Sequence, residues 1–347
     1  MSSKRVVLGV VLGIGLVFSG CESVFGKFVN DRSCEDDSDP QNRDCAQYPL
    51  PTTSNLYSVW GSTTGEAWVV GDGGTILRWS GHDWVSEVSG TAATLYSVWG
   101  LDSQHVWAVG GPEEPGGDSM ILFWDGVRWS RQQSNSKRTL RSVWASGDDV
   151  YTVGQNYTVL HSLRMTGSWA SVSLQNPKQV DLIGISGESS SNFRIVGDES
   201  TVLYFVDGTW TSNVTNYQSP SMQPVNLQSI FVSGKTVWTA GTNSTRGVTF
   251  REGSDKMLVT KEISQMSISF PGVWGTASNA WFVGSINSSA SFISLDANMN
   301  AKPIQTRIKA TPDGNISTAY RGIWGINDHE LWLVGDRGLI QRRRVAP

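Results

Sequence analysis

The chain contains three cysteines, Cys21, Cys34 and Cys45, whose thiols could be lipidated or joined in a disulfide. Before Cys21 the chain has Lys4 and Arg5, then an apolar run at 6–18, then two small residues. This order is typical of a secretory signal peptide, and the apolar run is too short to span a membrane comfortably. We therefore expect residues 1–20 to be a signal peptide.

The segment Phe18-Ser19-Gly20-Cys21 resembles the lipobox of bacterial lipoproteins, although Phe18 stands where leucine is commoner. The resemblance implies that Cys21 becomes the lipidated first residue after cleavage. Its acyl chains would anchor the protein to a membrane, because each buried methylene contributes ~0.8 kcal/mol. Glu22 follows instead of the aspartate that favours inner-membrane retention. An outer-membrane lipoprotein, periplasmic or surface-exposed, is the expectation, and plain secretion is the alternative.

Cys34 and Cys45 form an even pair in an exported chain, so we expect a disulfide between them. The loop that they enclose is acidic. It lacks the alternation and the glycine of a calcium-binding loop, which favours a solvated tether over 21–44. Its carboxylates belong to Glu35, Asp36, Asp37, Asp39 and Asp44.

The sequence contains no motif typical of metal binding, nucleophilic catalysis or phosphate binding. The histidines His82, His105, His161 and His329 have no metal-ligand spacing, and no nucleophile elbow or phosphate loop is found, so we expect no metal, cofactor or catalytic residue. The chain has 27 Lys and Arg against 31 Asp and Glu. Losing Lys4 and Arg5 with the signal peptide makes this balance more negative. Nucleic acid is therefore an unsuitable partner.

The elements that would position any site repeat along the chain. Leu56-Tyr-Ser-Val-Trp60-Gly61 recurs from Leu95, from Leu140 and, more weakly, four further times, each time followed by a block ending in Val-Gly or Ala-Gly. The repeat starts at 56, 95, 140, 182, 227, 270 and 320. Short β-branched and aromatic runs separated by turn residues, four per ~45 residues, predict β-propeller blades.

The sixteen tryptophans fall on a few fixed positions of this repeat, which favours packing between blades over ligand stacking. We predict an all-β, seven-bladed propeller over 45–347, with four antiparallel strands A to D in each blade. The last repeat ends before a strand D. The segment from Cys45 to Leu50 could supply it, with Tyr48 in the place of Trp84, so that an N-terminal strand closes the ring.

Val70-Gly-Asp-Gly-Gly-Thr-Ile-Leu77, followed by Gly81-His-Asp-Trp84, resembles the repeats of the photosystem II assembly factor group and of Asp-box (BNR) propellers. The resemblance implies the fold, because activities in that group vary. Sialidases are enzymes of the Asp-box class. Phe193-Arg194-Ile-Val196 is similar to their arginine motif but falls inside a strand B, so we interpret Arg194 as structural.

Insertions concentrate where the B-to-C and D-to-A connections emerge, at 111–119, 175–181, 213–226 and 296–318. Recognition often lies in loops on a rigid scaffold. We therefore expect this face to bind, with an acidic and aromatic rim formed by Glu113, Glu114, Asp118 and Tyr217.

Two functions stay open. The first is a lipid-anchored envelope module that binds or assembles a protein or glycan through the loop-rich face or the central channel. The alternative is a sialidase-like glycan hydrolase, which needs paired carboxylates in a pocket. Clustered acids and arginines at the channel mouth would favour the enzyme, and a channel plugged by apolar or small polar residues would favour binding.

Overall fold

The structure is a computed structural model. It describes residues 45–47, 51–164, 166–174, 179–212, 223–243, 246–252, 258–263, 268–286, 289–304, 319–327 and 330–344. Across these ranges the chain contains no helix long and apolar enough to cross a membrane.

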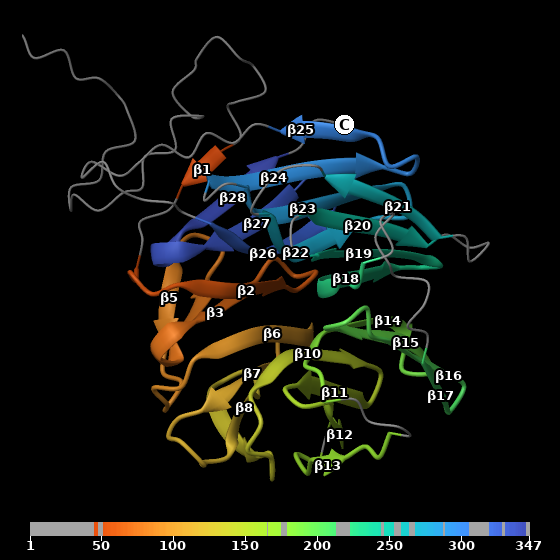
Figure 1. The fold of residues 1–347 in the computed structure, drawn as a ribbon. Coiled ribbons are helices and arrows are strands. Elements are labelled where there is room, and N and C mark those ends of the chain that lie inside the picture. The colour runs from red at the N-terminus through yellow and green to blue at the C-terminus, as the bar shows by residue number, and fades with distance from the viewer. Residues whose placement is uncertain are drawn as a thin grey trace, which may run out of the picture.

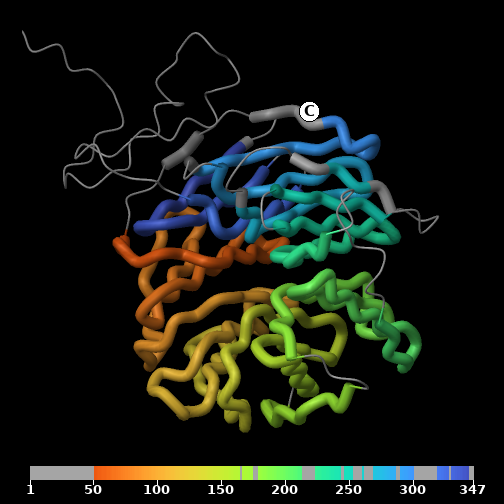
Figure 2. Tube along the Cα trace, viewed as in Figure 1, coloured from red at the N-terminus to blue at the C-terminus, as the bar shows by residue number. Residues whose placement is uncertain are grey.

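The described chain forms seven antiparallel sheets of four strands each, which are the blades of a β-propeller. The first and last blades lie side by side, so the orange and dark blue parts of the chain meet (Figures 1 and 2). The predicted fold is thus confirmed. In each blade, strand A is innermost and strand D is at the outer edge, as in the order β2-β3-β4-β5.

The strand bounds follow the sequence repeat. Blades one and two contain β2 (Leu56–Gly61), β3 (Ala67–Gly71), β4 (Ile76–Trp79), β5 (Trp84–Glu87), β6 (Leu95–Asp102), β7 (His105–Pro112), β8 (Ser119–Trp124) and β9 (Trp129–Gln133). Blades three and four contain β10 (Leu140–Ser146), β11 (Asp149–Gly154), β12 (Thr158–Leu163), β13 (Ala170–Ser171), β14 (Leu182–Ser189), β15 (Asn192–Gly197), β16 (Val202–Val206) and β17 (Thr209–Ser212).

Blades five and six contain β18 (Asn226–Ser233), β19 (Thr236–Thr242), β20 (Gly247–Glu252), β21 (Leu258–Ile263), β22 (Ile268–Gly275), β23 (Asn279–Ile286), β24 (Ser289–Asp296) and β25 (Ala301–Ile304). Blade seven contains β26 (Tyr320–Asn327), β27 (Glu330–Gly335), β28 (Ile340–Arg344) and the N-terminal β1 (Cys45–Gln47). Short 3-10 turns, η3 (Asp72–Gly74) and η4 (Asp336–Gly338), connect strands B and C in blades one and seven.

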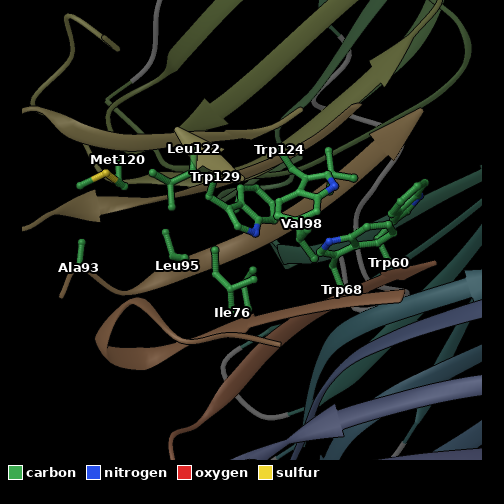
Figure 3. Close-up of a cluster of buried hydrophobic side chains, with 13 residues drawn as sticks. Trp60, Trp68, Ile76, Ala93, Leu95, Val98, Met120, Leu122, Trp124 and Trp129 are labelled. Carbon is green, nitrogen blue, oxygen red and sulfur yellow. The ribbon is translucent and has the colours of Figure 1, made fainter. Parts of the chain in front are cut away.

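The core lies between blades. Seven clusters of buried hydrophobic side chains in the described chain each join two adjacent blades. In the seam of blades one and two, Trp60 and Trp68 face Val98, Trp124 and Trp129 (Figure 3). Most tryptophans are buried, so their fixed places in the repeat reflect packing of large apolar rings.

The glycine that ends strand B in every repeat is required by a close approach. A Cβ atom on Gly110 would lie 2.1 Å from the carbonyl oxygen of Thr94, the residue before strand A of the same blade. The equivalent glycines of the other six blades would place a Cβ 1.8–2.3 Å from the corresponding carbonyl. No side chain fits there, which explains the invariance of this glycine along the repeat.

The ring closes through the N-terminal strand, as predicted. β1 pairs with β28, with Cys45 opposite Arg343 and Gln47 opposite Gln341. The register corrects one detail. Arg343 is the counterpart of Trp79, whose partner is Trp84, so Cys45 and not Tyr48 stands in the place of Trp84. Backbone pairing sets this register, whereas the prediction matched aromatic residues.

One connection is shorter than expected. Within 296–318, which the sequence indicated as an insertion, residues Ala301–Ile304 form β25, the strand D of blade six. The segment lacks the tryptophan that opens strand D in several other blades and contains Pro303, so it carries no strand signal. Proline is tolerated there because strand D is an edge strand.

Candidate binding site at the channel mouth

Strand A of every blade contains a β-bulge near its start. The pairing of β2 with β3 passes from Leu56 directly to Ser58, and five other A strands skip one residue in the same way. In blade six the shift lies between Ser269 and Gly272 of β22. A bulged residue is unpaired and its side chain is redirected. In each A strand the skipped residue directly before the pairing resumes is one of Tyr57, Tyr96, Arg141, Ile183, Gln228, Pro271 and Arg321, which we call the bulge ring.

All seven residues of the bulge ring line one cavity of about 150 Å³. Each follows a D-to-A connection, so the cavity opens on the face that carries these connections and the B-to-C turns, which we call the loop face. Pro271 fits because a bulged position needs no backbone N–H for the ladder. The cavity is the mouth of the central channel, since every blade contributes to it.

Aromatic rings close the channel below this cavity. The Trp99 and Trp324 rings, from blades two and seven, meet edge to face with centroids 5.3 Å apart, and Phe231 of blade five lies 6.4 Å from Trp324. Rings from non-adjacent blades can meet only near the axis. These rings therefore close the channel beyond the cavity, whose own lining contains no Trp or Phe.

Four neighbouring members of the bulge ring stack in the order Arg321, Tyr57, Tyr96, Arg141. The Arg321 guanidinium carbon lies 5.1 Å from the Tyr57 ring, the two tyrosine rings lie 5.3 Å apart, and the Arg141 carbon lies 4.7 Å from the Tyr96 ring. Such cation–π contacts contribute ~0.5–2 kcal/mol each and keep the side chains in place. The remaining members, Ile183, Gln228 and Pro271, are uncharged.

Aspartates that follow the strand B glycine brace this stack. Asp336 pairs with the Nε atom of Arg321 and accepts a hydrogen bond from the Ala319 amide. Its counterpart Asp72 accepts hydrogen bonds from the Asn55 and Thr94 side chains. Burial, together with the negative charge of Asp72, raises the pKa of Tyr57. Tyr57 is therefore a neutral hydrogen-bonding group at physiological pH.

Arg141 has a different environment. Its half-buried guanidinium makes no ion pair with a described residue, and its buried Nε atom has no hydrogen-bond partner in that part of the chain. Asp198, the counterpart of Asp72 in blade four, lies close enough to interact electrostatically. Burial, then repulsion by Asp181 and Glu199, raises the pKa of Asp198, and Arg141 only partly offsets this.

The lining of the cavity is suited to binding rather than to acid–base chemistry. It consists of the bulge ring, small residues such as Ser97 and Gly184, and branched aliphatic residues, without a carboxylate. The described residues also contain no group of three or more His, Cys, Asp or Glu side chains that could hold a metal ion.

The acidic residues predicted to bind lie elsewhere on the loop face. The Glu113 carboxylate accepts a 2.8 Å hydrogen bond from the Ala92 amide, and the Asp118 carboxylate accepts one from the Gln133 side chain. These contacts hold the β7–β8 loop against neighbouring segments. Neither residue lines the cavity, nor does Glu114. Tyr217 lies outside the described residues, and binding by this set stays a prediction.

Arg194 has the structural role that the sequence indicated. It lies in β15, forms a 2.8 Å ion pair with Glu252 of the next blade and stacks over Tyr204. Cys21 and Cys34 lie outside the described residues. Lipidation and the disulfide with Cys45 therefore stay predictions.

Sequence reasoning missed the bulge ring, although a signal exists. In the motifs Leu56-Tyr-Ser, Leu95-Tyr-Ser, Leu140-Arg-Ser, Leu182-Ile-Gly and Leu227-Gln-Ser, the second residue varies most while its neighbours stay apolar and small. A variable position inside a regular repeat marks a side chain free of the packing constraint. Alternation alone does not reveal the bulge that redirects it.

No protein-family model and no curated protein matches the sequence. Solved structures do match. YCF48 bound to D1 peptide is 14% identical, with a TM-score of 0.63, and the match covers 87% of this chain and 95% of that chain. YCF48 from Cyanidioschyzon merolae has the same identity, TM-score and coverage of this chain, with 99% of its own chain covered. The WD40 β-propeller domain of Doa1 is 12% identical, with a TM-score of 0.63 and 87% and 96% covered. At these identities the comparisons establish a shared propeller fold.

Proposed function

We infer that this chain is a non-enzymatic binding and assembly module that binds a protein partner on its loop face. The bulge ring is the central contact site for that partner. The observation that carries the proposal is the set of seven in-register bulges, each of which directs one side chain into the same cavity. Bulges redirect side chains at functional sites. A rigid ring of strands can hold such side chains in place without a ligand.

The closed channel supports a binding role. The contacts of Trp99 and Phe231 with Trp324 block passage through the molecule, so a ligand enters and leaves by the loop face. The folds of similar proteins add support. One similar structure, YCF48, is bound to a D1 peptide, and another is a WD40 domain. A propeller of this shape is thus able to hold a polypeptide.

The hydrolase alternative lacks a matching observation. Glycan hydrolysis commonly uses two carboxylates that flank the scissile bond. No Asp or Glu occurs among the residues that line the cavity. Arg194, the residue closest to a sialidase motif, is engaged by Glu252 between blades.

Affinity capture from envelope extract tests the role of the bulge ring. The double variant Tyr96→Ala with Gln228→Ala should reduce partner capture by about tenfold, because central contact residues contribute most of the binding energy of an interface. The matched control replaces Glu113, Glu114 and Asp118 by alanine on the same face. Loss of capture only in the control would place binding on the β7–β8 loop and contradict the proposal. Thermal unfolding of both variants monitors folding.

We further propose that lipid on Cys21 anchors the module to the bacterial cell envelope, at the outer membrane. The support is the sequence order of basic, apolar and small residues before Cys21. Cys21→Ser should abolish incorporation of a labelled fatty acid and move the protein to the soluble fraction. Unchanged labelling would contradict lipidation at this residue.

A further inference from the structure

The two arginines of the bulge ring differ in how their charge is compensated. Arg321 pairs through its Nε atom with Asp336, and this carboxylate also accepts from the Ala319 amide. Arg141 has no ion pair with a described residue, and its Nε atom is buried without a hydrogen-bond partner there. A buried donor without an acceptor costs free energy. Of the two ring arginines, Arg141 is thus the one whose guanidinium donors are not taken up by a described carboxylate.

The stacking of Arg141 limits what it can accept. With its guanidinium carbon 4.7 Å from the Tyr96 ring centroid, one face of the group is covered. Its donors lie in the guanidinium plane, in a fork that matches the two oxygens of a carboxylate. A planar acceptor presented edge-on therefore suits this site.

The size and polarity of the cavity limit the ligand further. A volume of about 150 Å³ admits one side chain rather than a folded segment. The opposite side of the ring is uncharged, and the Gln228 side-chain oxygen already accepts from the Phe270 amide at 2.9 Å. The other arginine of the ring, Arg321, is already paired with Asp336, which disfavours a multiply charged phosphate as the ligand.

On these grounds, and resting on the proposed function, we propose that Arg141 anchors the partner by binding the carboxylate of an Asp or Glu side chain that enters the channel mouth. The other ring residues enclose that side chain, and the loop face contacts the rest of the partner polypeptide. Arg321 acts only as a positioning residue for Tyr57.

Acidic side chains near Arg141 allow a carboxylate ligand to be distinguished from a cationic or an amide ligand. Asp198, Asp181 and Glu199 lie on the blade-four side of Arg141. Their negative charge repels a ligand carboxylate but would attract a cation, and Asp198 could accept a hydrogen bond from an amide ligand. Asp198→Asn should therefore tighten binding of a carboxylate, by about twofold to fivefold for one partly screened charge.

The test titrates the full chain with N-acetyl-glutamate α-methylamide and, as a matched probe, its glutamine analogue, monitored by NMR of the arginine Nε–H groups. The glutamate probe should shift the Arg141 signal and bind about tenfold more tightly than the glutamine probe. Arg141→Gln should remove this preference. Arg78→Gln, which removes a guanidinium stacked over Trp124 away from the cavity, should leave it intact.

Equal affinity for both probes, or weaker glutamate binding in Asp198→Asn, would overturn the proposal. So would absence of any shift with a folded protein. Capture of a partner that still depends on Tyr96 and Gln228 would then leave the proposed function standing. Capture that is insensitive to the whole ring would contradict that function itself. Thermal unfolding of Arg141→Gln and Arg141→Lys distinguishes lost recognition from lost folding.

Discussion

At the scale of single residues, the position in the blade decides what a side chain does. Tyr57 and Arg141 lie one residue after a buried leucine, yet the bulge turns them into the channel mouth. Arg194 lies in a regular strand B and is used for an ion pair between blades. The register of Arg194 inside a strand B indicated its structural role correctly, although the motif around it resembles that of an enzyme. The sequence could not indicate that Arg141 faces the channel mouth, because a bulge depends on strand pairing.

Asp198 provides a prediction about stability. Burial and the neighbouring Asp181 and Glu199 raise its pKa in the folded chain, so its charged form destabilises the fold at neutral pH. Asp198→Asn should raise the free energy of unfolding at pH 7. The gain should fade as the pH drops through the folded pKa and vanish below about 3.9, the ordinary aspartate value.

Urea unfolding of both proteins across this pH range measures the effect. Two results would contradict the prediction: a lower free energy of unfolding for Asp198→Asn at pH 7, or a gain in that free energy that persists unchanged at acid pH. Either would show that the charged carboxylate of Asp198 does not destabilise the fold.

At the scale of elements, the repeat encodes strands and their contacts well. Strands A and B were predictable from Leu56-Tyr-Ser-Val-Trp60 and its copies, because apolar alternation and the closing glycine persist. Strand D of blade six was not, since Ala301–Ile304 carries neither pattern. Its place comes from pairing with β24, a long-range contact.

The glycine that closes strand B supports a matched comparison. A Cβ on Gly110 would lie 2.1 Å from the Thr94 carbonyl oxygen, whereas one on Gly111 would meet nothing closer than 3.6 Å. Gly110→Ala should therefore destabilise the protein by about 2 kcal/mol or more, and Gly111→Ala should have little effect. Chemical denaturation checks both, and similar values for the two variants would refute the steric explanation.

The tight B-to-C turns provide a second comparison. Arg337 and Gly73 occupy equivalent turn positions, with φ of 57° and 63°. Side chains other than glycine are strained there by about 1 kcal/mol, and Cβ on Gly73 would meet no atom within 4 Å. Arg337→Gly should raise the melting temperature and Gly73→Ala should lower it. Changes of the same sign in both variants would contradict a purely backbone effect.

At the scale of the whole molecule, ring closure depends on a short strand. β1 contributes only Cys45–Gln47 to blade seven. The need for a closing strand was predictable from the truncated last repeat. The register was not, because three residues carry too little pattern to align by side-chain type.

Deleting Cys45–Gln47 should open the seam between the first and last blades. The loss of three paired residues should lower stability by about 2 kcal/mol. Amide hydrogen exchange should accelerate most in β28, compared with β12 in blade three as the internal control. Equal acceleration of exchange in β28 and β12 would contradict the prediction, because it would mean that loss of β1 destabilises the whole propeller and not blade seven in particular.

Binding at the channel mouth is tested most directly by photo-crosslinking in living cells from two sites on opposite faces. A photoreactive leucine analogue replaces Ile183 in the bulge ring or, as the control, Val127, which is 81% exposed in a C-to-D turn on the opposite face. We predict a discrete protein adduct from position 183 that is absent from position 127. An adduct only from position 127, or the same adducts from both, would contradict the assignment of the channel mouth as the binding site.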